Sequence, residues 1–161
     1  MEIVHRAMAA YLSNDEATVR KLVAPDIVMA TRPDQPDVRE HHGYDGMLRA
    51  SAEWLEAWDE QTFEAGRIWD AEDFVFVGTR ESGRGKISGV PMEYESTFVY
   101  TLSQGRIVRI QIFGSEREAV EAVGLYLDRE RASPTSPSHR TPAADRYSAR
   151  LTALRACSGE E

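Results

Sequence analysis

The spacing of the hydrophobic residues changes once along the chain, near Glu60, and this change most constrains the fold. Before Glu60 the apolar residues recur every three or four positions, as on the buried face of a helix. After Glu60 they alternate with polar residues, as in strands that bury one face. The sequence therefore predicts an α+β protein in which helices come first and strands follow.

Three helices are expected in the first part of the chain. The first carries Ile3, Met8 and Leu12 at helical spacing. Ser13 and Glu16 have the spacing of a capping box, which predicts Ser13 as the N-cap of a second helix that Pro25 stops. A strand over 26–31 follows, and residues 32–42, which contain two prolines, are expected to form a loop or a short edge strand. The third helix is predicted from the apolar face that runs from Tyr44 to Trp58.

Four strands and a closing helix are expected in the second part. The strands are predicted over residues 62–70, 74–80, 92–102 and 106–113. Gly105 allows a tight turn between the last two strands. A second capping box, Ser115 to Glu118, predicts a short final helix that ends at Gly124.

This order of elements predicts a cone: a curved antiparallel sheet with the three leading helices packed on its concave side. Such a cone holds a pocket between sheet and helices. The predicted domain covers residues 1–127. The segment 128–161 is rich in proline, serine and arginine, and such a composition predicts a largely disordered tail.

Charge and composition exclude several classes of function. The formal net charge of −8 disfavours binding to nucleic acid, which needs a basic surface. The apolar runs are far shorter than the roughly 20 residues of a membrane-spanning helix, so no membrane contact is expected. The single cysteine predicts neither a disulfide framework nor a thiolate metal site. We expect a cytoplasmic protein with no metal and no cofactor.

Several segments resemble one known family in their order along the chain. NDEATVRKLVAPDIV resembles the front half of SnoaL-like proteins in the nuclear-transport-factor-two superfamily, and ISGVPMEYESTFVYTLSQGRIVRIQIF resembles their strand hairpin. EREAVEAVGL resembles their closing helix. The resemblance covers about residues 3–125. It implies the cone fold, which hosts ketosteroid isomerases, polyketide cyclases, epoxide hydrolases and non-catalytic binding modules.

The resemblance also implies where catalytic groups would lie. The aspartate and histidine of the cyclases align with Ile112 and Phe98, and the isomerase acid aligns with Phe98 as well. The isomerase base aligns with Thr31 or Asp34, according to the gap chosen, and Tyr11 lies one turn beyond the isomerase tyrosine. Arg80 and Glu81 lie about one residue out of step with two members of the hydrolase set. Proton transfer at positions 98 and 112 is therefore excluded.

The residues expected to line the pocket come from both layers. Alternation places four residues of the last two strands on the side of Phe98, where they either complete the core or line an apolar pocket. Trp54 is expected in the core, at a subunit interface or in the pocket. The candidate ligand-binding residues are Tyr11, Thr31, Trp54, Ser96, Phe98, Tyr100, Ile110 and Ile112.

Three functions follow as hypotheses. The first is a small-molecule-binding domain with a mainly apolar pocket and no recognisable catalytic set. The second is an isomerase, cyclase or hydrolase of a polyketide, terpenoid or steroid-like substrate, with Asp34 or His42 as base. The third is a dimerisation module without a ligand. A homodimer through the sheet is expected, because Phe113 on its convex face needs cover.

Overall fold

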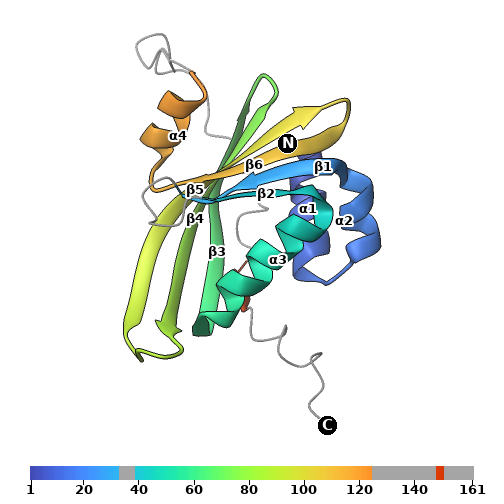
Figure 1. The fold of residues 1–161 in the computed structure, drawn as a ribbon. Helices are drawn as coiled ribbons and strands as arrows, with labels where there is room; N and C mark the ends of the chain where they lie inside the picture. Colours follow the sequence, from blue (N-terminus) through green and yellow to red (C-terminus); the bar gives the residue numbers. More distant parts are fainter. Residues whose placement is uncertain (33–38, 125–147, 151–161) are drawn as a thin grey trace.

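The computed structural model describes residues 1–32, 39–124 and 148–150 of the chain. Its elements follow the predicted order, helices before strands (Figure 1). They are α1 (Glu2–Leu12), α2 (Glu16–Leu22), β1 (Val23–Ala30), β2 (Glu40–His42), α3 (Gly43–Glu56), β3 (Trp58–Ala71), β4 (Phe74–Gly85), β5 (Pro91–Ser103), β6 (Arg106–Phe113), α4 (Glu116–Ala122) and β7 (Ser148–Arg150). None of the helices in the described ranges is long and apolar enough to cross a membrane.

The strands form one curved sheet in the order β2-β1-β6-β5-β4-β3-β7. The four long strands β3 to β6 pair as antiparallel neighbours, and β1 pairs with β6 in parallel. Gln104 and Gly105, both with positive φ, make the tight turn between β5 and β6. A glycine suits this position because it adopts a left-handed backbone without steric cost. The predicted α+β cone is confirmed.

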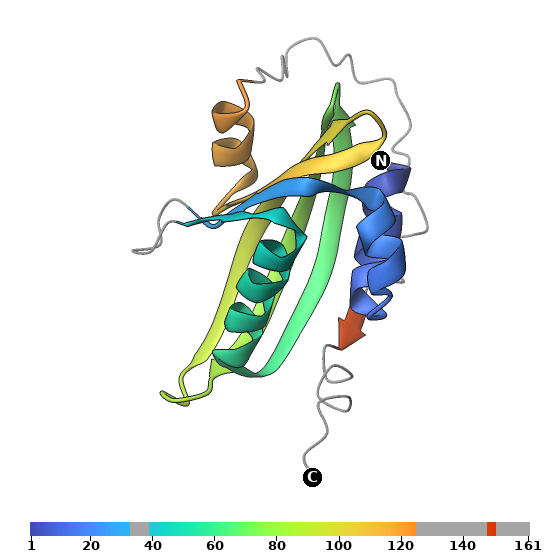
Figure 2. The ribbon, with the colours of Figure 1, turned by 45° about the vertical axis from the view of Figure 1, so that its right-hand side comes forward.

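The three leading helices lie on one side of the sheet and α4 lies on the other (Figures 1 and 2). Two apolar clusters reflect this arrangement. The larger joins α1, α2 and α3 to the inner face of the sheet, with Val4, Ile27 and Val77 fully buried. The smaller joins α4 to the outer face, where Trp69 stacks on Phe76 with ring centroids 3.9 Å apart.

The outer cluster corrects the reasoning that led to a dimer. Phe113 was expected to need cover from a second subunit, but it is only 5% exposed and packs with Ala119 of α4 in the same chain. The short closing helix supplies the cover, because it folds back over the end of β6 (Figure 1). A homodimer through the sheet stays a prediction, and Phe113 no longer argues for it.

The two predicted capping boxes have different outcomes. Ser115 is the N-cap of α4, accepts a hydrogen bond from the Glu118 backbone N–H at 3.3 Å, and so confirms the second box. The first prediction is wrong, because Asp15 caps α2 through the Thr18 backbone N–H at 3.0 Å. Ser13 instead ends α1, where its hydroxyl donates to the Ala9 carbonyl at 2.9 Å.

Most of the segment predicted as a tail lies outside the described residues. The exception is Ser148–Arg150, which forms β7 and pairs antiparallel with Thr62–Glu64 at the edge of β3. This short strand was not expected from the composition of the segment.

Candidate functional site

A cavity of about 410 Å³ lies between the inner face of the sheet and the helices α1 and α3. This volume is within the range of small-molecule pockets, roughly 300–1,000 Å³. Most of the surrounding side chains are apolar or aromatic. Seven of the eight residues expected to bind a ligand line it: Tyr11, Thr31, Trp54, Phe98, Tyr100, Ile110 and Ile112.

Strand register decides which side chains face the cavity. Met29 on β1 is opposite His41 on β2 and Ile110 on β6, and all three line the cavity. The adjacent row, in which Val28 pairs with both His42 and Arg109, therefore faces the other way. His41 is the histidine of the pair that contributes to the cavity.

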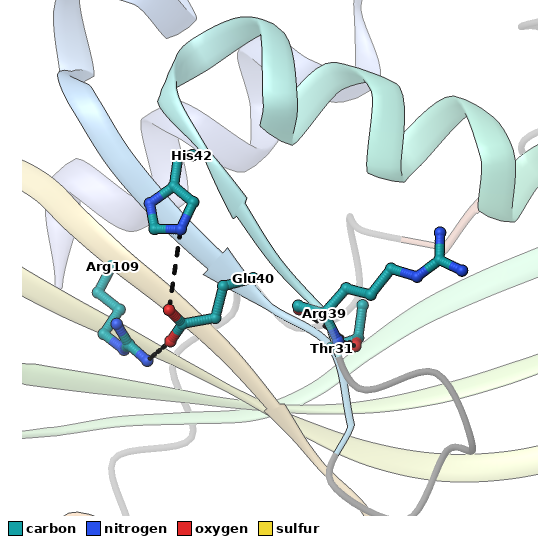
Figure 3. Close-up of polar contacts among 5 residues, drawn as sticks. All are labelled: Thr31, Arg39, Glu40, His42 and Arg109. Atoms are coloured by element: carbon teal, nitrogen blue, oxygen red, sulfur yellow. Dashed lines mark hydrogen bonds and ion pairs between the residues drawn. The ribbon is translucent and has the colours of Figure 1, made fainter.

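Of the two candidate bases, only His42 is described, and its side chain lies on the other face of the sheet. The His42 side chain is 69% exposed and lies 3.9 Å from the Glu40 carboxylate, on the face of the sheet that carries Arg109 (Figure 3). His42 was chosen from sequence over His41, and a shift of one residue reverses the face in a strand. Asp34 lies outside the described residues.

The outer face around His42 is held by an ion pair that crosses β1. Arg109 on β6 donates a hydrogen bond to Glu40 on β2 (Figure 3). This hydrogen bond, together with the positive charge of Arg109, lowers the pKa of Glu40. Backbone bonds between Thr31 and Arg39 close the nearby loop, and the Arg39 N–H also donates to the Thr31 hydroxyl at 3.0 Å. These contacts connect β2 to β6 and Arg39 to Thr31.

The Glu81 carboxylate lines the cavity although it is only 5% exposed. Its Oε2 accepts hydrogen bonds from the Tyr94 hydroxyl at 2.7 Å and from Gln61 Nε2 at 3.2 Å. Its Oε1 accepts one from the Ser96 hydroxyl at 3.2 Å. A carboxylate can accept about four hydrogen bonds, so three donors leave it one further acceptor position. Glu81 is the buried carboxylate among the described residues that line the cavity, whereas Glu53, which also lines it, is exposed.

Ser96, the eighth predicted residue, supports Glu81 from behind the cavity wall. It is 3% exposed and its hydroxyl lies 2.7 Å from the Thr79 hydroxyl, its cross-strand neighbour. When Thr79 donates to Ser96, the Ser96 proton is directed at Glu81. The two hydroxyls therefore orient the carboxylate, and Ser96 is not among the lining residues.

Aromatic rings surround the carboxylate. Trp54 of α3 meets Tyr94 edge to face, with centroids 6.1 Å apart, and also contacts Trp58 at 5.4 Å. Further along the sheet, Phe63 meets Phe98 edge to face at 6.0 Å. Edge-to-face pairs of this kind stabilise a fixed arrangement of the rings. The cavity thus has aromatic walls next to the Glu81 carboxylate.

Three tyrosines in the wall stay neutral near pH 7. Burial raises the pKa of Tyr94, and the charge and hydrogen bond of Glu81 raise it further. Burial likewise raises the pKa of Tyr100, with a smaller effect from Tyr11. Burial also raises the pKa of Tyr11, against a hydrogen bond with Ser51. Each phenol can therefore donate a proton in a hydrogen bond but does not serve as a base.

Sequence reasoning missed Glu81, Gln61 and Tyr94 as site residues. A signal for Glu81 exists in β4, where Val75, Val77 and Thr79 alternate onto the buried face and Glu81 continues the series. In the described ranges, no three His, Cys, Asp or Glu side chains gather as metal ligands.

Known proteins that resemble this chain share its fold. The family of SnoaL-like domains matches residues 4–110. Curated proteins give no match to the sequence. A nuclear-transport-factor-two-like protein from Burkholderia thailandensis has 27% identity and a TM-score of 0.63, with 76% of this chain and 95% of the other covered.

Two further solved structures share the fold at lower identity. A candidate SnoaL-like polyketide cyclase from Jannaschia has 18% identity and a TM-score of 0.59, covering 75% of this chain and 88% of the other. A protein from Catenulispora acidiphila with a ketosteroid-isomerase-like fold, in complex with trimethylamine, has 17% identity and a TM-score of 0.57. The matched parts cover 78% of this chain and 94% of that one.

Proposed function

The chain belongs to the family of SnoaL-like domains, and we propose that it binds a small, largely apolar molecule in the cavity between sheet and helices. The observation that carries the proposal is the cavity itself, about 410 Å³ and lined mostly by apolar and aromatic side chains. Burial of an apolar ligand there contributes about 25 cal/mol per Å² of surface removed from water. A dimerisation module without a ligand does not require such a cavity.

The positions where relatives keep acids favour binding over the known chemistries. Phe98 and Ile112 are direct cross-strand partners and both line the cavity. An isoleucine and a phenylalanine cannot transfer protons. They provide apolar contact area at the place where the resemblance would put a histidine and an aspartate.

A neutral probe of low polarity tests the proposal. Nile red fluoresces strongly in apolar surroundings, so we expect a blue-shifted, saturable signal with the full chain. Ile112→Trp should abolish the signal, because the larger side chain fills the cavity. Gln111→Trp is the matched control: Gln111 is the next residue on β6 and pairs with Ala30 in the outward row. Equal signals from both variants, each shown to be folded by circular dichroism, would contradict binding in the cavity.

An enzyme is the second candidate, and Glu81 is the observation that favours it. A buried carboxylate in a cavity is a common general base or acid. With His42 on the outer face, the described side chains of the cavity wall that can accept a proton include Glu81 and His41. Turnover of a polyketide, terpenoid or steroid-like substrate that Glu81→Gln removes and His42→Gln preserves would establish an enzyme with Glu81 as its catalytic group.

A further inference from the structure

The hydrogen bonds of Glu81 leave its negative charge without a positive partner in the described chain. Its three donors are a phenol, an amide and a hydroxyl, all of them neutral. At 5% exposure the carboxylate is also largely removed from water. A buried charge of this kind is expensive unless it is paired. A cation that enters the cavity would supply the missing charge.

A second acceptor lies beside Glu81. Gln61 is 9% exposed, and its Nε2 donates to the carboxylate, which fixes the orientation of the amide. The other amide atom, Oε1, is buried and has no hydrogen-bond partner in the described structure. Glu81 Oε1 accepts a single bond, from Ser96. This end of the cavity therefore offers acceptors to a ligand that carries N–H donors.

The aromatic rings at the same place suit a positive charge. Tyr94 binds Glu81 through its hydroxyl, and Trp54 packs edge to face against the Tyr94 ring. The faces of such rings attract cations. Tyr94 already attracts one, because the Arg32 guanidinium lies 5.7 Å from its ring centroid. Phe63 and Phe98, which also line the cavity, offer contact only to apolar groups.

From these contacts we infer that the cavity binds an organic cation: a protonated amine whose N–H groups donate to Glu81 and Gln61 and whose apolar body lies against Phe63 and Phe98. The inference rests on the proposed function, because it names the chemistry of the molecule in the cavity. Arg32, which also lines the cavity, disfavours a second positive charge on the ligand. The class is therefore a monoamine with an aromatic or alkyl body.

Three probes of matched size test the charge. Phenethylamine is a cation near neutral pH, phenethyl alcohol is its neutral counterpart, and propylbenzene has no polar group. Binding is measured by calorimetry on the full chain and by displacement of Nile red. Hydrogen bonds to charged groups predict that the amine binds about 10- to 100-fold more tightly than the alcohol. Hydrocinnamate, an anion of similar shape, is expected to bind most weakly.

Two variants locate the effect. Glu81→Gln keeps the shape of the side chain and removes the charge, so it should reduce the amine to the affinity of the alcohol. Glu56→Gln is the matched control, because Glu56 is an exposed glutamate of α3 that does not line the cavity. It should retain the preference for the amine. An equal loss in the two variants would overturn the role assigned to Glu81.

The outcome separates this inference from the proposed function. If Nile red and propylbenzene bind while amine and alcohol have equal affinity, the cation site is refuted and the apolar cavity stands. If none of the probes binds, both proposals fail. The comparison of amine with alcohol uses the unmodified protein, so it decides the matter even if Glu81→Gln does not fold.

Discussion

Truncation of Ile112 is expected to cost much less stability than truncation of Ile27, an isoleucine of β1 that does not line the cavity. Ile27 is 0% exposed and belongs to the inner apolar cluster. Its change to alanine creates a void in packed surroundings and should lower the free energy of unfolding by about 2–5 kcal/mol. Ile112 is half-buried and borders a space that already exists.

The stability cost of Ile112→Ala follows from the same reasoning. Complete burial contributes about 0.8 kcal/mol per methylene group, and Ile→Ala removes the equivalent of three. The Ile112 side chain has packed atoms on one side and the cavity on the other, so its truncation loses a smaller part of this free energy. We expect Ile112→Ala to lower the free energy of unfolding by about 1 kcal/mol. Ile112→Asp should also fold, because its carboxylate reaches the cavity, whereas Ile27→Asp should not.

Urea denaturation followed by tryptophan fluorescence measures both free energies on the same scale. Equal losses for Ile112→Ala and Ile27→Ala would refute the reasoning. They would mean that position 112 is packed on all sides and that the cavity does not exist there in solution.

Four further predictions follow. Arg109 lowers the pKa of Glu40, so an NMR titration should give Glu40 a pKa below its ordinary value, and Arg109→Gln should restore that value. The contribution of this ion pair to stability is present above the pKa of Glu40 in the unfolded chain and disappears as the pH falls through the lower pKa of the folded chain. Identical titration curves for the two proteins would contradict this prediction. Phe113→Ala should cost about 3–5 kcal/mol in urea denaturation, since Phe113 lies beneath α4, and a neutral result would contradict that packing. Truncation after residue 127 should leave the melting temperature within a few degrees of the full chain, because β7 adds three residues at one edge; a larger fall would show that the segment stabilises the domain. Sedimentation at micromolar concentration should show a homodimer, and a monomer would refute it.

The element types could be predicted because each depends on a local pattern. The change in period at Glu60 separates α3 from β3, and the predicted strand over 106–113 coincides with β6. Boundaries that depend on capping were less secure. Ser13 lies between two helices, and its hydroxyl could bond to either of them. It donates to α1 while Asp15 caps α2, and the spacing from Ser13 to Glu16 does not distinguish these arrangements.

The polar part of the site could not be predicted because it depends on contacts between strands. Alternation along β4 points Glu81 inward, but a carboxylate on an apolar face conflicts with ordinary burial preferences. The conflict is resolved by Gln61, 20 residues earlier, and Tyr94, 13 residues later, which both donate to it. Only the pairing of β3, β4 and β5 brings these three residues together.

The same pairing changes what the apolar residues at positions 98 and 112 mean. Taken alone, they suggest a cavity that has lost its acidic group. The structure instead places a carboxylate on β4, in a cross-strand row with Phe63 and Tyr94. A ligand that directs its polar group toward Glu81 would place its apolar body against Phe98 and Ile112, where the resemblance to the cyclases implies a histidine and an aspartate. The cavity wall therefore combines a carboxylate on β4 with an apolar surface on β5 and β6, and this difference would set the orientation of the ligand that we propose.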